Sequence, residues 1–588
     1  MYTIKSEQRA FSRRLASEPL FLLKHIRALA LAVSRRIKNR VVIGLSTHHR
    51  GRKVTPQWLS TEKGSDGAAR FPEAGPKLLP TYAHRVPKQA DHSFPAVGIR
   101  TSGQDREDYL ALHRWGFLLE RMLDNEVGWR AGIEACIQWI GDNTNTADPA
   151  WEPYSACERI ANFLVFFAAM PPAMREHGIP PQVGEFLSRS VTWVFGHLEY
   201  YGPAETNNHI LNNARALVLG GIATRDPLAV SAGLQIFRRC LPKLILSGGF
   251  LRERSSHYQL VVLNWVLDAW RFVAAAQGPD GEDARFLAGY ADRMRKAASM
   301  LCGCATSLLA VIGDVSPDFS PAQSLCRLAL LYPDWWPTVP WSAGGVAYAD
   351  GWFRFCKGEE VVMGNFPEGE FPCEFPTHGH SDFTSFVWLH DCQEMLVDPG
   401  RHRYAPDEVS PAQVGAAGHN LPTVNDIAPL CESVVPRGGW QPLPYAAARL
   451  RAAAVPDGIV LEHDGFARAT PVNRHIRRIE LQEHGLQVVD SFEGHGSVDL
   501  SFFWHFGEEF ERFDTVQMLA IGRAGNVRVE VRDLTGRPDR SPLATETFSS
   551  CISRAYGHML PSLSVCVSGR IELPASLATR FSWLAGGG

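Results

Sequence analysis

The residue types best suited to metal chemistry lie between residues 378 and 420 of this chain. A His-Gly-His sequence occupies 378–380, Asp398 begins an Asp-Pro-Gly turn, and His419 follows further along. Imidazole nitrogens and carboxylate oxygens are usual ligands of Zn²⁺. Segments 384–389 and 394–397 alternate as strands do, and a hairpin between them would bring Asp398 alongside the histidine pair. The pattern predicts a catalytic or structural metal site, although a His-x-His pair by itself is more often ordinary surface or core structure.

Two further groups of polar residues stand at the starts of amphipathic segments in the first half of the chain. Asn208 and His209 begin one such segment, and Glu253 and Arg254 stand shortly before Tyr258 at the start of another. An asparagine at a helix start can simply cap the helix, and a tyrosine there is more typical of packing. The functional alternative is that the amide and the imidazole are directed at an anionic ligand.

Trp151 and Arg159 form a third group, in which an aromatic ring and a guanidinium group lie close in sequence. Such groups suit stacking on a sugar ring and pairing with a carboxylate or sulfate. On composition alone, burial of the tryptophan in a core is the stronger alternative.

Composition and charge indicate a soluble globular protein. The chain has 588 residues, of which 45% are hydrophobic and 21% charged, with a formal net charge of −3. This length predicts two or three domains, and the balanced charge gives no indication of nucleic-acid binding. The twelve cysteines include no CxxC pair, and Cys136, Cys240, Cys392 and Cys566 lie in apolar segments typical of buried free thiols. This cysteine usage favours the cytoplasm.

The N-terminal part of the chain differs from the rest. Residues 1–55 are basic and amphipathic, and residues 56–104 are rich in Pro, Gly, Ser and Lys, which predicts a linker or an irregular segment. The longest uninterrupted apolar run in the basic segment, Ala28 to Val33, is too short for a secretory signal or a membrane span. The basic segment either packs on the body of the protein or makes a peripheral contact with anionic lipid or an acidic polymer.

The hydrophobic period changes once along the remaining chain. Across 105–340, apolar residues recur at three- and four-residue spacing between short Gly- or Pro-containing loops, which predicts helical hairpins. Across 341–588 the period is two, with regular turn residues, which predicts an antiparallel β-sandwich. We therefore expect an α+β multidomain protein, with a complete or incomplete N-terminal α/α toroid followed by a C-terminal β-sandwich.

Five segments resemble, in the same order, motifs of the heparinase II/III-like polysaccharide lyase superfamily. They are 206–217, 253–258, 378–386, 396–400 and 418–424. The resemblance extends from Asp105 to the C-terminus and implies the family's fold, an α/α toroid joined to a β-sandwich with the active cleft between them. That fold agrees with the change of hydrophobic period.

The resemblance implies a carbon–oxygen lyase that cleaves a uronic-acid-containing polysaccharide by β-elimination. Loss of the C5 proton of a uronate builds charge on an already anionic group, so the carboxylate must be neutralised; the resemblance assigns this to Asn208 and His209. Tyr258 would protonate the departing glycosidic oxygen. The base would be Tyr258 itself as a phenolate, His378, or Tyr404 as a second tyrosine. Heparan-sulfate-like, alginate-like and bacterial exopolysaccharide substrates all fit this chemistry.

The resemblance also implies a structural role for the histidine cluster. His380, Asp398 and His419 match the family's structural zinc ligands, which would fix the loop that carries His378. Ser381 stands where the family usually has alanine, which is a mild departure. The residues that we expect to contact the polysaccharide are Trp151, Arg159, Glu253 and Arg254.

Two alternatives to an active lyase remain open from the sequence. A non-catalytic glycan-binding factor in surface-polysaccharide synthesis or turnover would keep the same residues without turnover. A glycoside hydrolase would need two facing carboxylates, and the sequence offers no convincing pair. Because no secretory signal is recognised, we expect a cytoplasmic or inner-membrane-peripheral protein whose partner is an acidic polysaccharide, and a periplasmic location stays open as an alternative.

Overall fold

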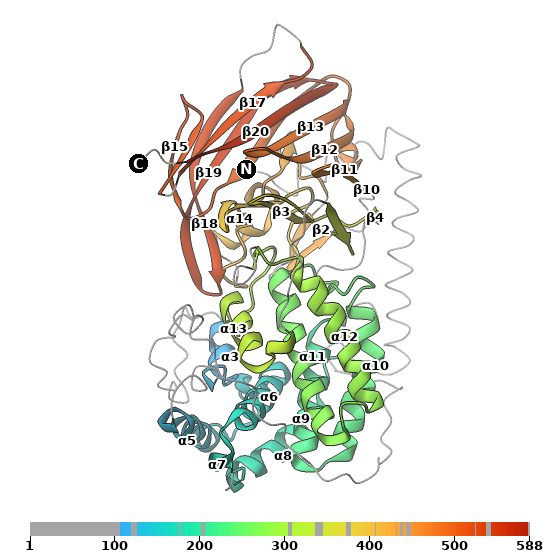
Figure 1. Cartoon of the computed structure of the whole chain (residues 1–588), viewed down its shortest axis with the longest axis vertical. Coiled ribbons are helices and arrows are strands. Elements are labelled where there is room, and N and C mark those ends of the chain that lie inside the picture. Colours follow the sequence, from blue (N-terminus) through green and yellow to red (C-terminus); the bar gives the residue numbers. More distant parts are fainter. Residues whose placement is uncertain are drawn as a thin grey trace.

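The computed structural model describes residues 106–118, 126–175, 178–201, 206–303, 309–335, 345–371, 378–405, 407–430, 432–435, 439–442, 448–523, 525–536 and 543–585. The basic segment predicted at 1–55 and the linker predicted at 56–104 lie outside these ranges. The predicted domain boundary between 340 and 341 does too. Figure 1 shows the helices gathered at one end of the molecule and the sheets at the other.

The helical part is built from consecutive pairs of helices. α9 (His209–Thr224) packs against α10 (Pro227–Leu244), and α11 (Ser256–Gln277) packs against α12 (Glu282–Ser299). α9 also contacts α11, α8 (Pro181–Gly196) and α6 (Pro153–Ala169). The remaining helices and 3-10 turns of this part are α3 (Arg106–Leu112), α5 (Glu126–Asp142), η2 (Pro149–Trp151), α7 (Pro172–Arg175), α13 (Pro321–Leu331) and η3 (Pro333–Trp335). The predicted helical toroid is confirmed.

α9 and α11 lie at the centre of the helical part and have no solvent-exposed face over most of their length. Nearly all side chains of α9 from Ile210 to Ile222 are buried, and so are those of α11 from Ser256 to Ala269. α12 is amphipathic by contrast, with a single buried stripe that faces α11. The functional residues of this part therefore stand at the ends of buried helices, whose positions are fixed by packing on all sides.

Four antiparallel sheets form the second part. The nine-stranded sheet has the order β15-β16-β17-β20-β13-β12-β11-β10-β4, the four-stranded sheet β18-β19-β14-β7, the five-stranded sheet β1-β2-β3-β5-β6 and the smallest β8-β9. The five-stranded sheet comprises β1 (Val346–Ala349), β2 (Trp352–Lys357), β3 (Glu360–Asn365), β5 (Val387–His390) and β6 (Gln393–Leu396). The four-stranded sheet comprises β7 (Pro422–Val424), β14 (Ser497–His505), β18 (Ala544–Ala555) and β19 (His558–Glu572), and the two-stranded sheet β8 (Glu432–Val435) and β9 (Gly439–Pro442). The nine-stranded sheet comprises β4 (Gly369–Phe371), β10 (Ala448–Val455), β11 (Gly458–His463), β12 (Val472–Gln482), β13 (Gly485–Gly494), β15 (Phe510–Asp514), β16 (Leu519–Gly522), β17 (Gly525–Asp533) and β20 (Ala575–Ala585). Short helices interrupt the strands at α14 (Ser410–Val414), η4 (Ala416–Gly418) and η5 (Gly465–Arg468).

The five-stranded sheet joins the two parts because its two faces belong to different cores. Val361 and Met363 of β3 pack in the helical core, whereas Val362 between them packs in the core of the β-sandwich. Val387 and Leu389 of β5 face the helices in the same way. This strict alternation is what a period of two produces in a strand buried on both faces. Figure 1 shows β2 and β3 between the helices and the upper sheets.

The predicted hairpin before Asp398 is confirmed. β5 and β6 pair antiparallel, although β5 begins at 387 rather than at the predicted 384. The start is later because Thr384 has φ +73°, outside the strand region, and its carbonyl accepts a hydrogen bond from Arg477. The interpretation of Cys392 as a free thiol is wrong: it lies in the turn of this hairpin and is joined in a disulfide to a cysteine outside the described residues.

No helix among the described residues has both the length and the apolar character needed to cross a membrane.

Candidate functional site

The predicted catalytic residues meet where the helices contact the β part. Asn208 directly precedes α9, and Tyr258 lies in the first turn of α11, whose cap is the Ser255 hydroxyl accepting from the Tyr258 amide at 3.1 Å. His378 and Tyr404 come from loops of the β part. Two helix starts and two loops therefore assemble a cluster that no single element contains.

Glu253 is the centre of the polar contacts in this cluster. It is fully buried, and its two carboxylate oxygens accept from the backbone amide of Asn208 at 2.7 Å and from Asn208 Nδ2 at 2.9 Å. The same carboxylate lies 3.5 Å from His378 Nε2, and the Glu253 carbonyl accepts from the His378 amide at 3.1 Å. Glu253 thus holds Asn208 of the helical part and His378 of the β part in one arrangement.

His378 is fixed on both edges of its ring. Nδ1 lies 3.1 Å from Asp314 Oδ2, and Nε2 lies 3.2 Å from Asn208 Nδ2. Because the Asn208 amide nitrogen can only donate, Nε2 is the acceptor and Nδ1 carries the proton donated to Asp314. The Asp314 amide also donates to the His378 carbonyl at 2.9 Å. Although burial acts in the opposite direction, the charge of Arg401 and the hydrogen bonds from His378 and His380 lower the pKa of Asp314.

Two tyrosine hydroxyls meet beside this histidine. The ring of Tyr258 stacks on that of His378, with centroids 3.6 Å apart and planes 7° from parallel. Its hydroxyl lies 2.8 Å from the hydroxyl of Tyr404, which is also 3.5 Å from the Val315 carbonyl. Burial raises the pKa of both tyrosines well above 10, so both are neutral phenols at physiological pH. The expectation of a Tyr258 phenolate stabilised by neighbouring cations therefore does not describe the free protein.

His209 is a cation at neutral pH. Its Nδ1 lies 3.1 Å from Glu199 Oε1, and its ring lies 4.7 Å from the ring of Tyr154. Burial is the largest single effect and would lower its pKa, but the charge and hydrogen bond of Glu199, together with the charges of Glu152 and Glu253, raise the pKa to about 9. Because 35% of its side-chain surface is exposed, this charge is accessible to a ligand.

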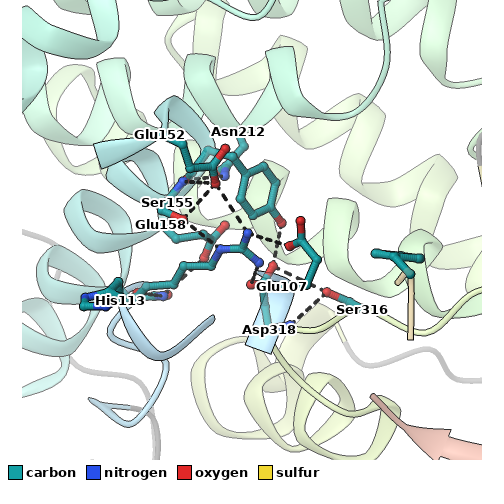
Figure 2. A network of polar contacts seen from close by, with 12 residues as sticks. Glu107, His113, Glu152, Ser155, Glu158, Asn212, Ser316 and Asp318 are labelled. Atoms are coloured by element: carbon teal, nitrogen blue, oxygen red, sulfur yellow. Dashed lines mark hydrogen bonds and ion pairs between the residues drawn. The ribbon is translucent and has the colours of Figure 1, made fainter. Parts of the chain in front are cut away.

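A buried arginine organises the region behind His209. Figure 2 shows the polar groups that surround it, and the side chains that accept hydrogen bonds from Arg114 are Asp318 at 2.7 Å, Glu107 at 2.9 Å, Ser155 at 3.0 Å and Glu152 at 3.4 Å. Tyr154, whose ring contacts His209, donates to the second oxygen of Asp318 at 2.5 Å. Asp318 lies in the same segment as Asp314 and Val315, whose carbonyl contacts Tyr404. The network therefore connects this segment to α6, the helix that carries Tyr154.

Gly313 allows that loop to approach His378. It has φ +80°, and a Cβ atom built on it would lie 2.7 Å from the His378 carbonyl oxygen and 2.8 Å from that of Arg254. We expect Gly313→Ala to destabilise the protein by about 1–3 kcal/mol, because it combines left-handed backbone strain with contact against two fixed carbonyls. Gly289→Ala is the matched control: Gly289 lies within α12 with nothing within 4 Å of the new atom, so we expect stabilisation of about 0.5–1 kcal/mol. Urea unfolding of the two variants measures the difference, and equal midpoints would contradict the prediction.

The predicted metal ligands come together in the β part. His380, Asp398 and His419 each offer one ligand atom, and these atoms all lie within 4.8 Å of one another. All three residues are buried. His380 Nε2 lies 3.0 Å from Asp314 Oδ1, and its other ring nitrogen, Nδ1, is buried without a hydrogen-bond partner. A carboxylate on one nitrogen and a bare second nitrogen is the usual state of a metal-binding histidine, so these residues fit a metal ion such as zinc.

The structure places two predicted substrate-binding residues away from this cluster. Trp151 is packed with Trp139, Phe186 and Trp193, and Arg159 is fully buried. Arg159 donates to the carbonyls of His113 and Ala150 at 2.8 Å and 2.6 Å and lies over the rings of Trp139 and Trp151. The prediction that Trp151 and Arg159 contact the polysaccharide is corrected accordingly, because both side chains serve the helical core.

The two other predicted substrate contacts are also buried. Glu253 has no exposed surface and is occupied by Asn208 and His378, so it orients the cluster rather than binding sugar. Arg254 is 8% exposed and lies 5.0 Å over the ring of Phe383, which leaves little of it for a ligand.

Sequence reasoning missed Glu199 and the structural importance of Asp314. Neither residue lies in a recognisable motif: Glu199 stands in Leu-Glu-Tyr-Tyr, and Asp314 in the apolar segment before α13. Each reaches its histidine only through the tertiary fold, at sequence separations of 10 and 64 residues.

Comparison with known proteins finds one matching family model and several solved structures of similar fold. Residues 351–584 match the family described as heparinase II/III-like, C-terminal. No curated protein matches the sequence. The structure is similar to that of a heparinase III, with a TM-score of 0.58 and 14% identity over 81% of this chain and 77% of the other. It is also similar to a mutant heparan sulfate lyase from Pedobacter heparinus, with a TM-score of 0.52 and 17% identity over 81% and 77%.

A second heparinase III structure gives a TM-score of 0.54 with 14% identity, over 82% of this chain and 80% of the other. At these identities the structural likeness establishes a shared fold, and it covers the helical part as well as the sandwich. The match of residues 351–584 adds the sequence relationship in the part that carries His378, Tyr404 and the three clustered metal-ligand residues. Residues 351–584 thus match the heparinase II/III-like C-terminal family, and the described chain shares the fold of these lyases.

Proposed function

We propose that this protein is a polysaccharide lyase that cleaves a uronic-acid-containing polysaccharide by β-elimination. The observation that carries the proposal is the pair of Tyr258 and Tyr404 hydroxyls, 2.8 Å apart, beside His378 and the Asn208–His209 pair. Proton donors, a proton acceptor and a cation are the groups that this elimination requires. The similarity to a heparinase III and to a heparan sulfate lyase supports the same reaction class.

Asn208 and His209 would make different contacts with the uronate. The imidazolium of His209 supplies the positive charge that a carboxylate needs. The amide nitrogen of Asn208 is already bonded to Glu253 and His378, whereas its amide oxygen is buried without a hydrogen-bond partner. That oxygen accepts hydrogen, so it suits a sugar hydroxyl or the carboxyl group in protonated form.

The elimination itself needs one base and one acid. The base removes the C5 proton, the electron pair of that bond forms the C4–C5 double bond, and the C4–oxygen bond breaks. Tyr258 protonates the departing oxygen, since its raised pKa keeps the phenol protonated until the leaving group requires the proton. Two side chains can serve as the base. His378 would take the C5 proton through Nε2. Tyr404 would take it while passing its own proton along the 2.8 Å contact to Tyr258, as Tyr258 gives its proton to the departing oxygen.

Ultraviolet absorbance during incubation with a panel of uronate polysaccharides tests this proposal. Elimination leaves a conjugated double bond at the new non-reducing end, whereas hydrolysis leaves none. A rise with one polymer that Tyr258→Phe abolishes supports a lyase and names its substrate. Tight binding without absorbance change or new reducing ends would instead favour a non-catalytic glycan-binding protein.

We further propose that His380, Asp398 and His419 hold a structural zinc ion that fixes the loop that carries His378. A bound ion would link the loop after the His-Gly-His sequence to the ends of β6 and η4. We expect about one zinc per chain by elemental mass spectrometry, and loss of it in His419→Ala with a fall in Tm of about 5 °C or more. His390→Ala is the control, because His390 pairs with Glu360 outside the cluster. A wild-type chain whose metal content and Tm do not respond to chelation would overturn the proposal.

The biological setting is proposed from the sequence alone. The basic segment at 1–55 would bring the protein to an anionic membrane surface, in a role in synthesis or turnover of the cell's own surface polysaccharide. Recovery of all the protein in the soluble fraction after cell lysis would count against it.

A further inference from the structure

We propose that Glu199 is a positioning residue that keeps His209 protonated, so that His209 presents a permanent positive charge to the substrate carboxylate. The protonation of His209 concerns the free protein and is argued from the contact between Glu199 and His209. The contact with a uronate rests on the proposed function.

Glu199 is held rigidly in the orientation that faces His209. It is 3% exposed, and Oε1 lies 3.1 Å from His209 Nδ1. Its second oxygen, Oε2, accepts from Asn213 Nδ2 at 3.1 Å, while its own backbone amide donates to Asn213 Oδ1 at 2.6 Å. Asn213 lies one turn after His209 on the same helix, α9. The helix therefore carries both the histidine and the amide that locks the histidine's partner in place.

Two effects oppose a charged His209, and the carboxylates overcome them. Burial disfavours the imidazolium, and a cation at the first residue of a helix lies at the positive end of the helix dipole. The groups that face His209 are Glu199, the ring of Tyr154, and the charges of Glu152 and Glu253 at longer range. Every charged group among them is acidic, and only Glu199 is in direct contact. Removing that one carboxylate therefore leaves the opposing effects dominant.

The opposite edge of the imidazolium is available to a ligand. The structure gives Nε2 of His209 no hydrogen bond to any described residue, and 35% of the side-chain surface is exposed. With Nδ1 directed at Glu199, Nε2–H is the donor that can reach a carboxylate. Glu199 thus sets both the charge and the direction of the contact.

Deuterium exchange at the imidazole Cε1 of His209, followed by peptide mass spectrometry across pH, measures the pKa without any substrate. We expect a midpoint near 9 in the wild type. In Glu199→Gln we expect it at or below the ordinary value of about 6.5, because burial then dominates. With the polymer identified in the absorbance assay, KM of Glu199→Gln should rise roughly tenfold or more at pH 8. It should approach the wild-type KM below the variant's own midpoint, where the variant histidine also becomes protonated.

The control is Glu360→Gln, which removes another buried carboxylate that lies 2.9 Å from a histidine, His390, away from the cluster. It should lower stability without moving the His209 midpoint or the pH dependence of KM. A wild-type His209 midpoint at or below 6.5 overturns the proposal even if Glu199→Gln fails to fold. So does a midpoint that Glu199→Gln leaves unchanged. If no polymer is cleaved, the proposed function fails while the exchange experiment still decides whether Glu199 charges His209.

Discussion

Replacing Tyr258 with phenylalanine is expected to lower kcat by roughly 10²- to 10⁴-fold, the usual contribution of a positioned proton donor. The substitution removes only the hydroxyl. The ring remains to stack on His378 at 3.6 Å, and the backbone amide remains capped by Ser255. KM should therefore change little, since the charge of His209 and the orientation of Asn208 do not depend on this hydroxyl. Initial rates of absorbance increase across substrate concentrations measure both quantities.

The stability of Tyr258→Phe separates a chemical effect from a structural one. The hydroxyl makes one hydrogen bond to another side chain, to Tyr404, so its loss should cost only about 1 kcal/mol of unfolding free energy. Tyr109→Phe is a matched control, because it likewise removes a part-buried hydroxyl that bonds another side chain, in this case the carboxylate of Asp148. This variant should leave kcat unchanged. A near-wild-type kcat in Tyr258→Phe would show that Tyr404 or His378, rather than Tyr258, is the general acid.

Most of the fold could be predicted from the sequence because the hydrophobic period is a local property. The change from a helical period to a period of two identified the two parts, and the hairpin of β5 and β6 followed from alternation alone. The double role of the five-stranded sheet could not be predicted. Val361, Val362 and Met363 are all apolar, and a continuous apolar run does not reveal that alternate residues pack in two different cores.

The candidate site was likewise predictable only in part from the sequence. Asn208, Tyr258, His378 and the three predicted metal ligands lie in motifs with family-like spacing, and the structure brings each group together. Trp151 and Arg159 were selected by residue type, and type alone does not distinguish a sugar platform from a core in which a guanidinium lies over two tryptophans. Glu199 and Asp314 were missed because their importance arises only from tertiary contacts with a histidine.

Glu253 shows most clearly how burial changes the meaning of a residue. From the sequence it was a substrate contact, but in the structure its carboxylate accepts two hydrogen bonds from Asn208 and faces His378. We expect Glu253→Gln to lower kcat/KM by about 10²- to 10³-fold. Glutamine has the same shape, yet its NH₂ group must face either the amide or the side-chain nitrogen of Asn208, and both are donors. One Asn208 contact is therefore lost in any orientation, at about 1.5–3 kcal/mol for a hydrogen bond to a charged group.

The double variant with Asn208→Ala tests whether Glu253 acts through Asn208. If it does, Glu253→Gln should have almost no further effect on kcat/KM once Asn208 is truncated, so the two losses will not add. Additive losses, or a loss of Tm in Glu253→Gln without loss of kcat/KM, would show that Glu253 only supports the fold. The distinction matters for the whole cluster. Asn208 comes from a helix start and His378 from a loop of the β part, and the Glu253 carboxylate contacts both. A site assembled between two parts of a chain depends on such a residue, because neither part alone determines how the other's side chain is turned.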